Sequence, residues 1–329
     1  MNKIIGQETL IKEINRIFQI FKNSQCRLRP HFILTGESGS GKSFTIKQLC
    51  EANKLDFLEV NAAQLTREGT SYTIFSFPDG EKQISIDSEI DRKQEIKVIC
   101  RVTNADELFI LMQVNDILSR HEVKWFLYIT YLMSMRMDRV MDFNRPFSLK
   151  IVSNILKNFS CYDVEVLEPH SDKTVDLMGS YGNYFLCTLD CDFPEDSTII
   201  YPDEGSRERY QGFLNNGFYK KRGMITFNKK RNLKTGKIES FEIDYANLTS
   251  KNFVFVDDLC DGGGTFLGEL EVLKEKYPDG VFTLIVCHAV NEQGLRKVLD
   301  KFDKVIISNS YKDWDKIIKS DKLIVEKVW

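Results

Sequence analysis

The sequence predicts an α/β protein built around parallel sheets, and three observations support this prediction. Several strand-like runs are apolar throughout, among them FVFV at 253–256 and FTLIVC at 282–287. They alternate with helical stretches such as GELEVLKEKY, which is typical of parallel strands that helices cover on both faces. Two strands also lead into glycine-rich turns, GESGSGKS and DGGGT, and each turn precedes a helical pattern.

The first segment reads as a truncated β-α-β unit that ends near Ser71. Apolar residues recur at helical spacing over residues 4–21. After a basic link, RLRP, we expect a strand at HFILT, the loop GESGSGKS, a helix at FTIKQLCEAN and a second strand at DFLEVNAAQL. We therefore place a first domain at residues 1–71.

Two further domains are expected, at residues 72–185 and 186–329. The earlier one begins with short β-like runs and continues with a helix, a strand, a helix and a strand: TIFSF, QISID, EIKVICRV, NADELFILMQVNDILSRH, VKWFLYITYL, FSLKIVSNILKNF and DVEVLEPH. Asn104 or Asp106 is the expected cap of its first helix. The later domain carries five apolar strands: STIIYPDEG, GMITFNK, FVFVDD, FTLIVCHAV and KVIISNS.

The composition narrows the class of protein. Hydrophobic residues make up 42% and charged residues 28% of the 329 residues, which is ordinary for a soluble chain that buries a core. The formal net charge of -3 argues against a general nucleic-acid or membrane surface. No apolar run approaches the roughly 20 residues of a membrane helix. The eight scattered cysteines and the absence of a signal-peptide pattern favour reduced thiols in a cytoplasm.

The turn GESGSGKS fits the phosphate-binding loop of P-loop nucleotide-binding proteins, since it follows a strand and precedes a helix. Gly36 and Gly41 would let backbone N–H groups face phosphate oxygens, while Lys42 reaches the terminal phosphates and Ser43 holds magnesium. A glycine-rich surface turn is the alternative. The sequence around this loop, from IIGQETLIKEI to FLEVNAAQL, resembles the N-terminal part of an AAA+ ATPase. Such an ATPase also needs a second acidic strand nearby, and the first strand of that form, VFVDD, lies more than 200 residues downstream.

The stretch DDLCDGGGT has the chemistry of a ribose-phosphate site. A buried strand would deliver Asp257 and Asp258 to its carboxyl end, where paired carboxylates suit the two hydroxyls of a ribose. The residues from Asp261 to Thr265 would then lead into a helix whose N–H groups and dipole suit a phosphate. A simple helix cap after a core strand is the alternative reading.

The loop resembles the phosphoribosyl pyrophosphate loop of type I phosphoribosyltransferases. The motifs over residues 72–329 resemble, in the same order, those of the ribose-phosphate diphosphokinases, also called phosphoribosyl pyrophosphate synthetases. The resembling segments are FPDGE at 77–81, RMDR at 136–139 with RPFSLKIVSNIL after it, EPHS with His170, YPDEGSRER with Asp203 and Arg209, and NKKR with Lys229 and Arg231. The resemblance implies two type I phosphoribosyltransferase-like parallel-sheet domains behind the truncated P-loop segment.

The resemblance also implies roles for particular residues. They are ATP binding by Phe77, Asp79, Glu81, Arg136 and Asp138; catalysis by Lys229, Arg231 and Arg136; magnesium binding by His170 and Asp203; and ribose-phosphate binding by Asp257, Asp258, Asp261, Gly262, Gly263, Gly264 and Thr265. The implied reaction moves a diphosphoryl group from Mg-ATP to the anomeric hydroxyl of a ribose 5-phosphate, and AMP leaves. The adenine-contacting turn comes from a neighbouring subunit in this family, so a homo-oligomer with its active site near a subunit interface is implied.

Each of these residues could also have a purely structural role. His170 could be an ordinary loop histidine, and Phe77 could belong to the core. Lys229, Lys230 and Arg231 could form a solvated hairpin before the turn-like NLKTGK. Their shared order along the chain favours the functional interpretation.

The chain departs from the family pattern at several places. Met137 replaces the usual glutamine of the ATP loop, Ser206 replaces a glycine, and Gly262 stands where a threonine or serine is common. The family's first β-α unit is missing before FPDGE. Gly262 removes a hydroxyl donor beside the 5′-phosphate and opens room beyond it, so ADP-ribose becomes a second candidate acceptor. Compact phage-type members, which would act in a host cytoplasm, resemble this chain in that loop and are associated with NAD synthesis.

Two rival functions stay open. One is an AAA+-like ATPase that combines GESGSGKS with VFVDD. The other is a non-catalytic regulator with a phosphoribosyltransferase fold, although the presence of Lys229 and Arg231 argues against it.

Overall fold

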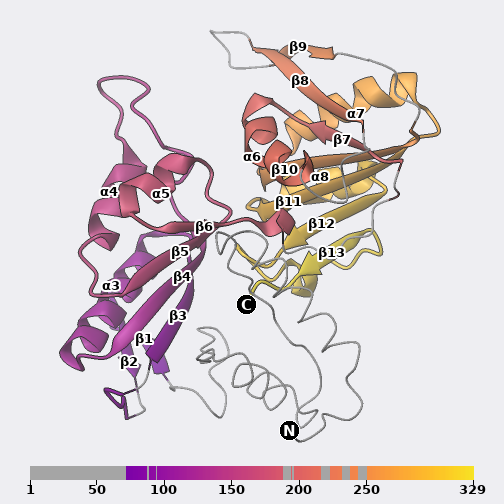
Figure 1. The fold of residues 1–329 in the computed structure, drawn as a ribbon. Helices are drawn as coiled ribbons and strands as arrows, with labels where there is room; N and C mark the ends of the chain where they lie inside the picture. The colour runs from indigo at the N-terminus through magenta and orange to yellow at the C-terminus, as the bar shows by residue number, and fades with distance from the viewer. Residues whose placement is uncertain are drawn as a thin grey trace, which may run out of the picture. The chain divides into compact units, whose positions relative to one another are not determined.

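The structure is a computed structural model, and it describes residues 72–86, 89–93, 95–187, 194, 196–215, 223–231, 238–243 and 250–329. The chain divides into two compact units, Met1–Tyr184 with Val328–Trp329 (unit 1) and Phe185–Lys327 (unit 2). Each unit contains its own sheet (Figure 1). The P-loop segment expected over residues 1–71 lies outside the described residues, so the three-part division stays a prediction.

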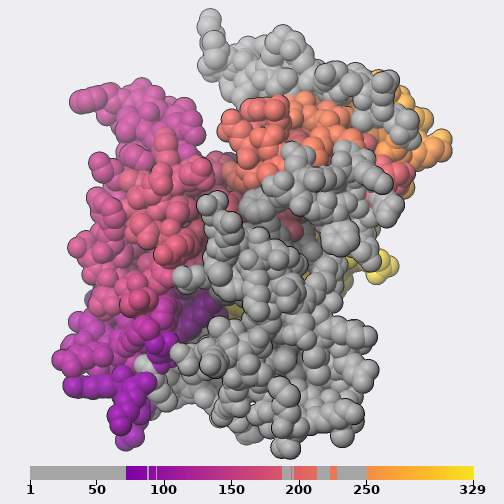
Figure 2. Space-filling view, in the orientation of Figure 1, coloured from indigo at the N-terminus to yellow at the C-terminus, as the bar shows by residue number. Residues whose placement is uncertain are grey.

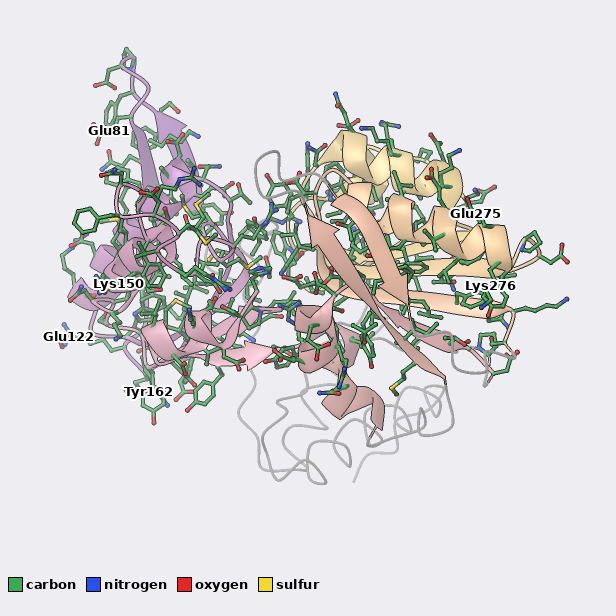
Figure 3. All side chains as sticks on the ribbon, turned by 90° about the horizontal axis from the view of Figure 1, so that it is seen from above. Glu81, Glu122, Lys150, Tyr162, Glu275 and Lys276 are labelled. Atoms are coloured by element: carbon green, nitrogen blue, oxygen red, sulfur yellow. The ribbon has the colours of Figure 1, made fainter. Side chains whose placement is uncertain are left out.

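Unit 1 contains a four-stranded parallel sheet in the order β3-β4-β5-β6 and a separate hairpin of β1 and β2. The strands are β1 Tyr72–Ser76, β2 Lys82–Ile86, β3 Glu95–Val102, β4 Lys124–Leu132, β5 Asp163–Leu167 and β6 Tyr181–Asn183. The helices are α3 Ala105–Arg120, α4 Ser148–Leu156 and α5 Asp172–Met178. The β1–β2 hairpin projects from this unit, and Glu81 is labelled beside its turn (Figure 3).

Helix α3 shows how the sequence sets these elements. Of the two expected caps, Asn104 is the N-cap, and its side-chain oxygen accepts from Glu107 N at 3.0 Å. The Glu107 carboxylate in turn accepts from Thr103 N at 2.6 Å, so donors at the start of the helix are satisfied from both sides. Its buried residues recur at helical spacing: Leu108, Leu111, Val114 and Leu118.

Unit 2 is a seven-stranded sheet in the order β13-β12-β11-β10-β7-β8-β9, parallel except for the β8–β9 pair. The strands are β7 Thr198–Tyr201, β8 Met224–Arg231, β9 Ile238–Ile243, β10 Asn252–Cys260, β11 Val281–Ala289, β12 Lys304–Ser308 and β13 Leu323–Glu326. The helices are α6 Glu204–Asn215, α7 Gly264–Lys276 and α8 Glu292–Lys301, with 3₁₀ turns η1 Phe185–Cys187 and η2 Trp314–Lys316.

Aromatic packing between strands and helices fixes the core of unit 2. Phe253 of β10 stacks on Phe282 of β11 with ring centroids 5.1 Å apart, and Phe255 meets Phe302 edge to face at 5.2 Å. Offset and edge-to-face arrangements are the favourable ones for aromatic pairs. These contacts anchor the amino-terminal half of β10, directly before Asp257 and Asp258, in the core. The all-apolar strands predicted at β10, β11 and β12 are found in one parallel sheet, as expected.

The β4–α4 loop stands out from unit 1 (Figures 1 and 2). It carries exposed apolar side chains at Met137, Val140, Met141 and Phe143, the last of them 99% exposed. In the part of the chain that the structure describes, no helix is both long and apolar enough to span a membrane.

Candidate functional site

The predicted acceptor site lies at the point in the unit 2 sheet where the strand order reverses. Strand β7 lies between β10 and β8, and the chain builds the sheet outward in both directions from the β7–β10 pair. Ligands of open α/β sheets bind outside the carboxyl ends of the strands at such a switch point. Asp257 and Asp258 lie in the carboxyl-terminal half of β10, and Asp203 follows β7. The topology thus brings these three acids to one sheet edge.

Arg209, on helix α6, forms an ion pair with both acids of β10. Its Nη1 lies 3.0 Å from Asp258 Oδ1 and 3.7 Å from Asp257 Oδ1. The three side chains are 12%, 5% and 15% exposed, in the order Arg209, Asp258 and Asp257. A charge pair this far from solvent is weakly screened and holds its geometry. The sequence associated Arg209 with a motif but did not place it in the site, because no local pattern shows which strand a helical arginine faces.

The crowding of acids changes the protonation of Asp257. Burial raises the pKa of Asp257 well above the usual aspartate range, and the negative charges of Asp258 and Asp203 raise it further. The Arg209 guanidinium opposes these effects and lowers this pKa. A carboxylate in this position is stabilised by hydroxyl donors or by a cation, which is the chemistry of a ribose or metal site.

Helix α6 is fixed to β10 by Ser206. The Ser206 hydroxyl donates to Val256 O at 2.5 Å, directly before the acid pair, and Ser206 N donates to Asp203 Oδ1 at 3.0 Å. Ser206 is only 1% exposed. The residue that departs from the family pattern therefore connects the helix that carries Arg209 to the strand that carries the acids.

The predicted phosphate loop has an open backbone. Gly263 is the N-cap of α7 with φ of 75°, a left-handed conformation that favours glycine. A Cβ placed on Gly262 or Gly264 would meet nothing within 4 Å. Because the cap is a glycine, no cap side chain covers the first amides of α7, and a phosphate can approach them. Asp261 and Thr265 are both half-buried at the ends of this loop.

In unit 1 the structure brings RMDR and EPHS together. Asp138 is 4% exposed, and its Oδ1 accepts from Arg139 Nε at 2.8 Å. This hydrogen bond is the main cause that lowers the pKa of Asp138, and the Ser171 side chain, beside His170, lowers it further. Arg136 is exposed and His170 is half-buried. Asp138 of the predicted ATP loop therefore lies near Ser171 of the predicted metal-site segment, and its lowered pKa favours the ionised carboxylate.

The FPDGE turn forms the tip of the β1–β2 hairpin. Phe77 N donates to Glu81 O at 2.8 Å, and Gly80 has φ of 93° at the turn. Asp79 Oδ1 accepts from Glu81 N at 3.1 Å, so this carboxylate also shapes the turn. The Phe77 side chain is 45% exposed, which makes a core role wrong and leaves the ring accessible for stacking.

Lys229 and Arg231 lie on β8 beyond its pairing with β7, where β8 continues as a hairpin with β9. The β8–β9 hairpin is the one expected if these residues had a purely structural role. It also places both residues beyond the part of β8 that pairs with the parallel sheet. Their catalytic role stays a prediction. The pairing of His170 with Asp203 on one magnesium ion also stays a prediction, because the two residues belong to different units. Among the described residues, no three His, Cys, Asp or Glu side chains gather in a metal-binding arrangement.

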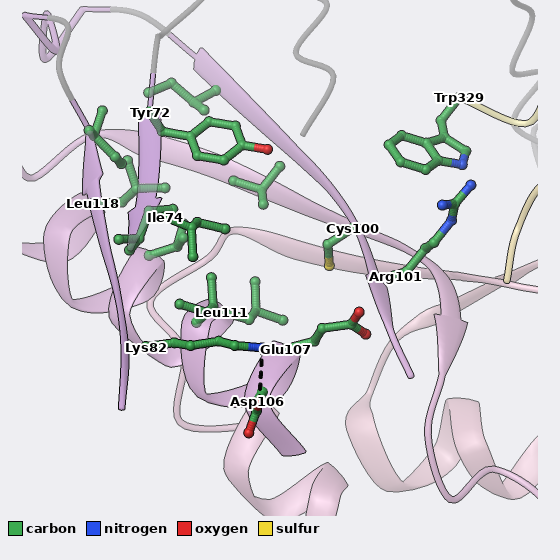
Figure 4. Close-up of a pocket in the computed structure, with 16 residues that line it drawn as sticks. Tyr72, Ile74, Lys82, Cys100, Arg101, Asp106, Glu107, Leu111, Leu118 and Trp329 are labelled. Atoms are coloured by element: carbon green, nitrogen blue, oxygen red, sulfur yellow. Dashed lines mark ion pairs between the residues drawn. The ribbon is translucent and has the colours of Figure 1, made fainter. Parts of the chain in front are cut away.

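A separate cavity of about 430 Å³ lies in unit 1 (Figure 4). Aliphatic side chains of the β1–β2 hairpin, β3 and α3 line most of it, and Arg101 stacks its guanidinium on Trp329 at the rim, 4.3 Å from the ring centroid. None of the predicted site residues lines this cavity.

Comparisons with known proteins agree with this geometry. Over 87% of this chain and 91% of the other, the fold matches the crystal structure of phosphoribosylpyrophosphate synthetase from Mycobacterium smegmatis, with a TM-score of 0.65 at 16% identity. The predicted α/β fold with two parallel-sheet domains is therefore confirmed, whereas the P-loop segment expected before them lies outside the described residues.

Sequence relatives carry the same kind of name. The chain is 24% identical to the ribose-phosphate pyrophosphokinase of Mycoplasmopsis pulmonis over 289 residues, 84% of each chain. It is 26% identical to that of Pyrococcus furiosus over 256 residues, 73% of this chain and 86% of the relative. No protein-family model matches the sequence. The similarity supports a transferase of the kinase type, as the sequence predicts.

Proposed function

We propose that this chain is an ATP-dependent diphosphokinase that acts on a ribose 5-phosphate-type sugar. The observation that carries the proposal is the contact of Arg209 with Asp257 and Asp258 at the sheet switch point, directly before the open phosphate loop. Similarity to ribose-phosphate pyrophosphokinases over most of the chain supports the same assignment.

The acceptor site follows from the chemistry of β10 and its loop. The ionised carboxylates of Asp257 and Asp258 accept hydrogen bonds from the two ribose hydroxyls, while Arg209 balances their charge. The backbone amides from Gly262 to Thr265 face the 5′-phosphate, and the start of α7 favours its negative charge. Sugar and phosphate are thus held side by side by one strand and the loop after it.

The nucleotide site is assigned to motifs in unit 1. The Phe77 ring stacks on adenine, and Asp79 and Glu81 accept from its exocyclic amine. Arg136 and Asp138 contact the rest of the nucleotide. The hairpin comes from a neighbouring copy in our proposal, and the exposed apolar side chains of Ile74 and Phe75 beside Phe77 suit a surface covered in a homo-oligomer.

The reaction balances as a single displacement. The anomeric oxygen forms a bond to the β-phosphorus of ATP, the bond from that phosphorus to the α,β-bridging oxygen breaks, and AMP leaves with that oxygen. The anomeric proton passes to solvent. Lys229, Arg231 and Arg136 stabilise the negative charge that builds on the transferred group and the leaving oxygen.

The residues present fit magnesium that is carried by ATP. Magnesium usually takes one or two carboxylates together with phosphate oxygens and water, so a protein cage is not needed. Asp203 lies close enough to the acid pair for its charge to raise the pKa of Asp257. Its carboxylate would take part in binding the ion, and His170 of unit 1 would bind it directly or through water. When bound, the ion would neutralise phosphate charge, and Asp203 and His170 are the residues that would hold it.

The finer question is which acceptor the loop takes. The empty space around a Cβ at Gly262 leaves room beyond a 5′-phosphate, where ADP-ribose carries its second phosphate and adenosine. We propose ADP-ribose as a second acceptor beside ribose 5-phosphate. A Gly262→Thr variant should lose turnover of ADP-ribose at least tenfold more than turnover of ribose 5-phosphate, because the added side chain fills that space.

Product analysis tests the proposed function. The chain is incubated with Mg-ATP and either ribose 5-phosphate or ADP-ribose, and products are identified by mass spectrometry. We expect AMP with an equal amount of diphosphorylated acceptor. Release of ADP and inorganic phosphate without modified sugar would instead indicate the ATPase reading. Turnover of ribose 5-phosphate alone would reject ADP-ribose while it leaves the diphosphokinase intact.

A further inference from the structure

The phosphate loop rests directly on the first turn of helix α8. A Cβ added to Gly294 would lie 1.6 Å from Asp261 O, and a Cβ added to Gly263 would lie 2.9 Å from Val298 Cγ1 and 3.2 Å from Gly294 O. Since real Cβ atoms do not approach other atoms so closely, glycine is required on both sides of this contact. The shape of the loop therefore depends on where α8 begins.

Asn291, the N-cap of α8, connects these two elements by hydrogen bonds. Its Oδ1 accepts from Gln293 N at 2.9 Å and from Gly294 N at 3.2 Å. Because both neighbours are donors, the oxygen must face the helix, and Nδ2 then faces the loop. There Nδ2 donates to Asp261 Oδ1 at 3.3 Å. One side chain thus caps α8 and holds the first carboxylate of the phosphate loop.

The platform beneath Asn291 is rigid. Val290 N donates to Cys260 O at 3.0 Å, which ties the turn to the end of β10. Ala289 O accepts from the indole of the buried Trp314 at 2.8 Å. The buried His288 ring meets Ser310 Oγ at 2.8 Å. These contacts hold the residue before Asn291 in place, so its amide has little freedom to follow Asp261.

Helix α8 is not itself the anion site. Asn291 already occupies its Gln293 and Gly294 amides, and the acidic Glu292 lies in its first turn. An approaching phosphate would meet satisfied donors and a negative charge there. The free loop amides belong to the turn before α7, and Asp261 lies at the entrance of that turn.

We infer that Asn291 is a positioning residue for the acceptor site: by holding Asp261, it keeps the amides of Gly262–Thr265 directed at the sugar phosphate. This inference rests on the proposed function for its ligand. If the contact with Asn291 were lost, Asp261 would gain freedom to turn its negative charge towards the phosphate or to accept from the loop amides itself. The Asn291 amide prevents both, and it does so without adding a positive charge.

Serine in place of Asn291 separates the two roles of this side chain. In an Asn291→Ser variant the hydroxyl still caps α8, since serine is a good N-cap, but it is too short to reach Asp261. The matched control is Asn104→Ser at the N-cap of α3 in unit 1. We expect the KM for ribose 5-phosphate to rise about tenfold in Asn291→Ser, with the KM for ATP and the Tm close to wild type. Asn104→Ser should leave both KM values unchanged.

An Asn291→Asp variant gives a second test. Aspartate caps the helix as well as asparagine does, but it places a negative charge against Asp261. The KM for the acceptor should rise more than in Asn291→Ser, while the Tm stays within a few degrees of wild type. An acceptor KM within twofold of wild type in both variants would overturn the inference. A parallel rise of both KM values together with a fall in Tm would also overturn it, because it would indicate a capping role alone.

Amide hydrogen exchange of the loop makes the test independent of turnover. The Gly262–Thr265 amides should exchange several-fold faster in Asn291→Ser than in wild type, with no change in the β10 amides. If wild type releases no AMP with any sugar phosphate, the proposed function fails, and this exchange comparison still decides the positioning role. Equal loop exchange in variant and wild type would overturn that role whatever the reaction is.

Discussion

Arg209 Nη1 lies 3.0 Å from Asp258 Oδ1, and this contact joins helix α6 to strand β10 at the edge of the sheet where a ligand would bind. The two residues are 49 positions apart in the sequence, so the contact depends on the fold as a whole. It balances a cluster of acids that is otherwise costly to ionise.

Removal of the Arg209 charge should weaken acceptor binding. In Arg209→Gln the buried acids lose their cation, and we expect the KM for ribose 5-phosphate to rise by roughly 10- to 100-fold. Steady-state kinetics at saturating ATP measures this change. Arg207→Gln is the matched control, because Arg207 lies on the same helix and pairs with the exposed Glu204. Equal effects of the two substitutions would contradict a specific role for Arg209.

The pH dependence of acceptor binding should report Asp257. Its pKa is raised by burial and by the neighbouring acids, so acceptor affinity should fall on the acid side at a pH above the ordinary aspartate range. Arg209 lowers this pKa, and Arg209→Gln should therefore move the acid limb to still higher pH. Because a raised aspartate pKa means that the folded state binds its proton more tightly, the ionised group makes folding less favourable as pH rises through that range. A profile of kcat/KM against pH checks the direction, and a shift to lower pH in the variant would be inconsistent with it.

The buried Ser206 hydroxyl should contribute to stability as well as to alignment. Ser206→Ala leaves Val256 O without this donor in a buried position, at a cost of about 1–3 kcal/mol in the free energy of unfolding. Urea unfolding followed by circular dichroism measures the cost. The substitution should also raise the acceptor KM, since α6 then holds Arg209 less firmly. A stable variant with a wild-type KM would show that the hydrogen bond does not align the site.

Phe77 should affect the nucleotide and not the sugar. Phe77→Ala removes an exposed ring, so the Tm should change little, while the KM for ATP should rise about tenfold if the ring stacks on adenine. Phe109→Ala is the control, because Phe109 on α3 is similarly exposed and has no predicted role in the site. A rise in the KM for the acceptor, with the KM for ATP unchanged, would contradict the assignment of Phe77 to the adenine site.

Lys42 separates the proposed function from the ATPase alternative. Substitution of Lys42 by alanine should leave AMP release from Mg-ATP and ribose 5-phosphate within twofold of wild type. In a P-loop this lysine reaches the β- and γ-phosphates of the bound nucleotide. Because the proposed diphosphokinase site does not include GESGSGKS, its reaction should not need Lys42. Loss of all nucleotide turnover in this variant would favour the ATPase reading.

The sequence predicted the parts of the site that are local. An apolar run followed by acids and glycines was enough to predict that β10 carries Asp257 and Asp258 near its carboxyl end and leads through Gly263 into α7. Capping chemistry was enough to narrow the cap of α3 to Asn104 or Asp106, and the structure shows that it is Asn104. These features depend on residues only a few positions apart, so the local hydrophobic periodicity and the capping residues are enough to predict them.

The contacts between distant elements were not predicted. Nothing near Arg209 indicates that it faces β10, and nothing near Asn291 indicates that it reaches Asp261, because both depend on how helices pack on the sheet. Strands β6, β9 and β13 were also missed. Strand β13 is short, and it is defined by its parallel pairing with β12 at one end of the sheet. Tertiary pairing decides such strands more than their own sequence does.

The most direct test of the central claim is a crystal structure with ribose 5-phosphate and a non-hydrolysable Mg-ATP analogue. The proposed function predicts the ribose hydroxyls within hydrogen-bond distance of Asp257 and Asp258, with the 5′-phosphate on the amides of Gly262–Thr265. If the sugar phosphate lay elsewhere and the triphosphate of the analogue occupied those acids through its magnesium, the claim would be contradicted.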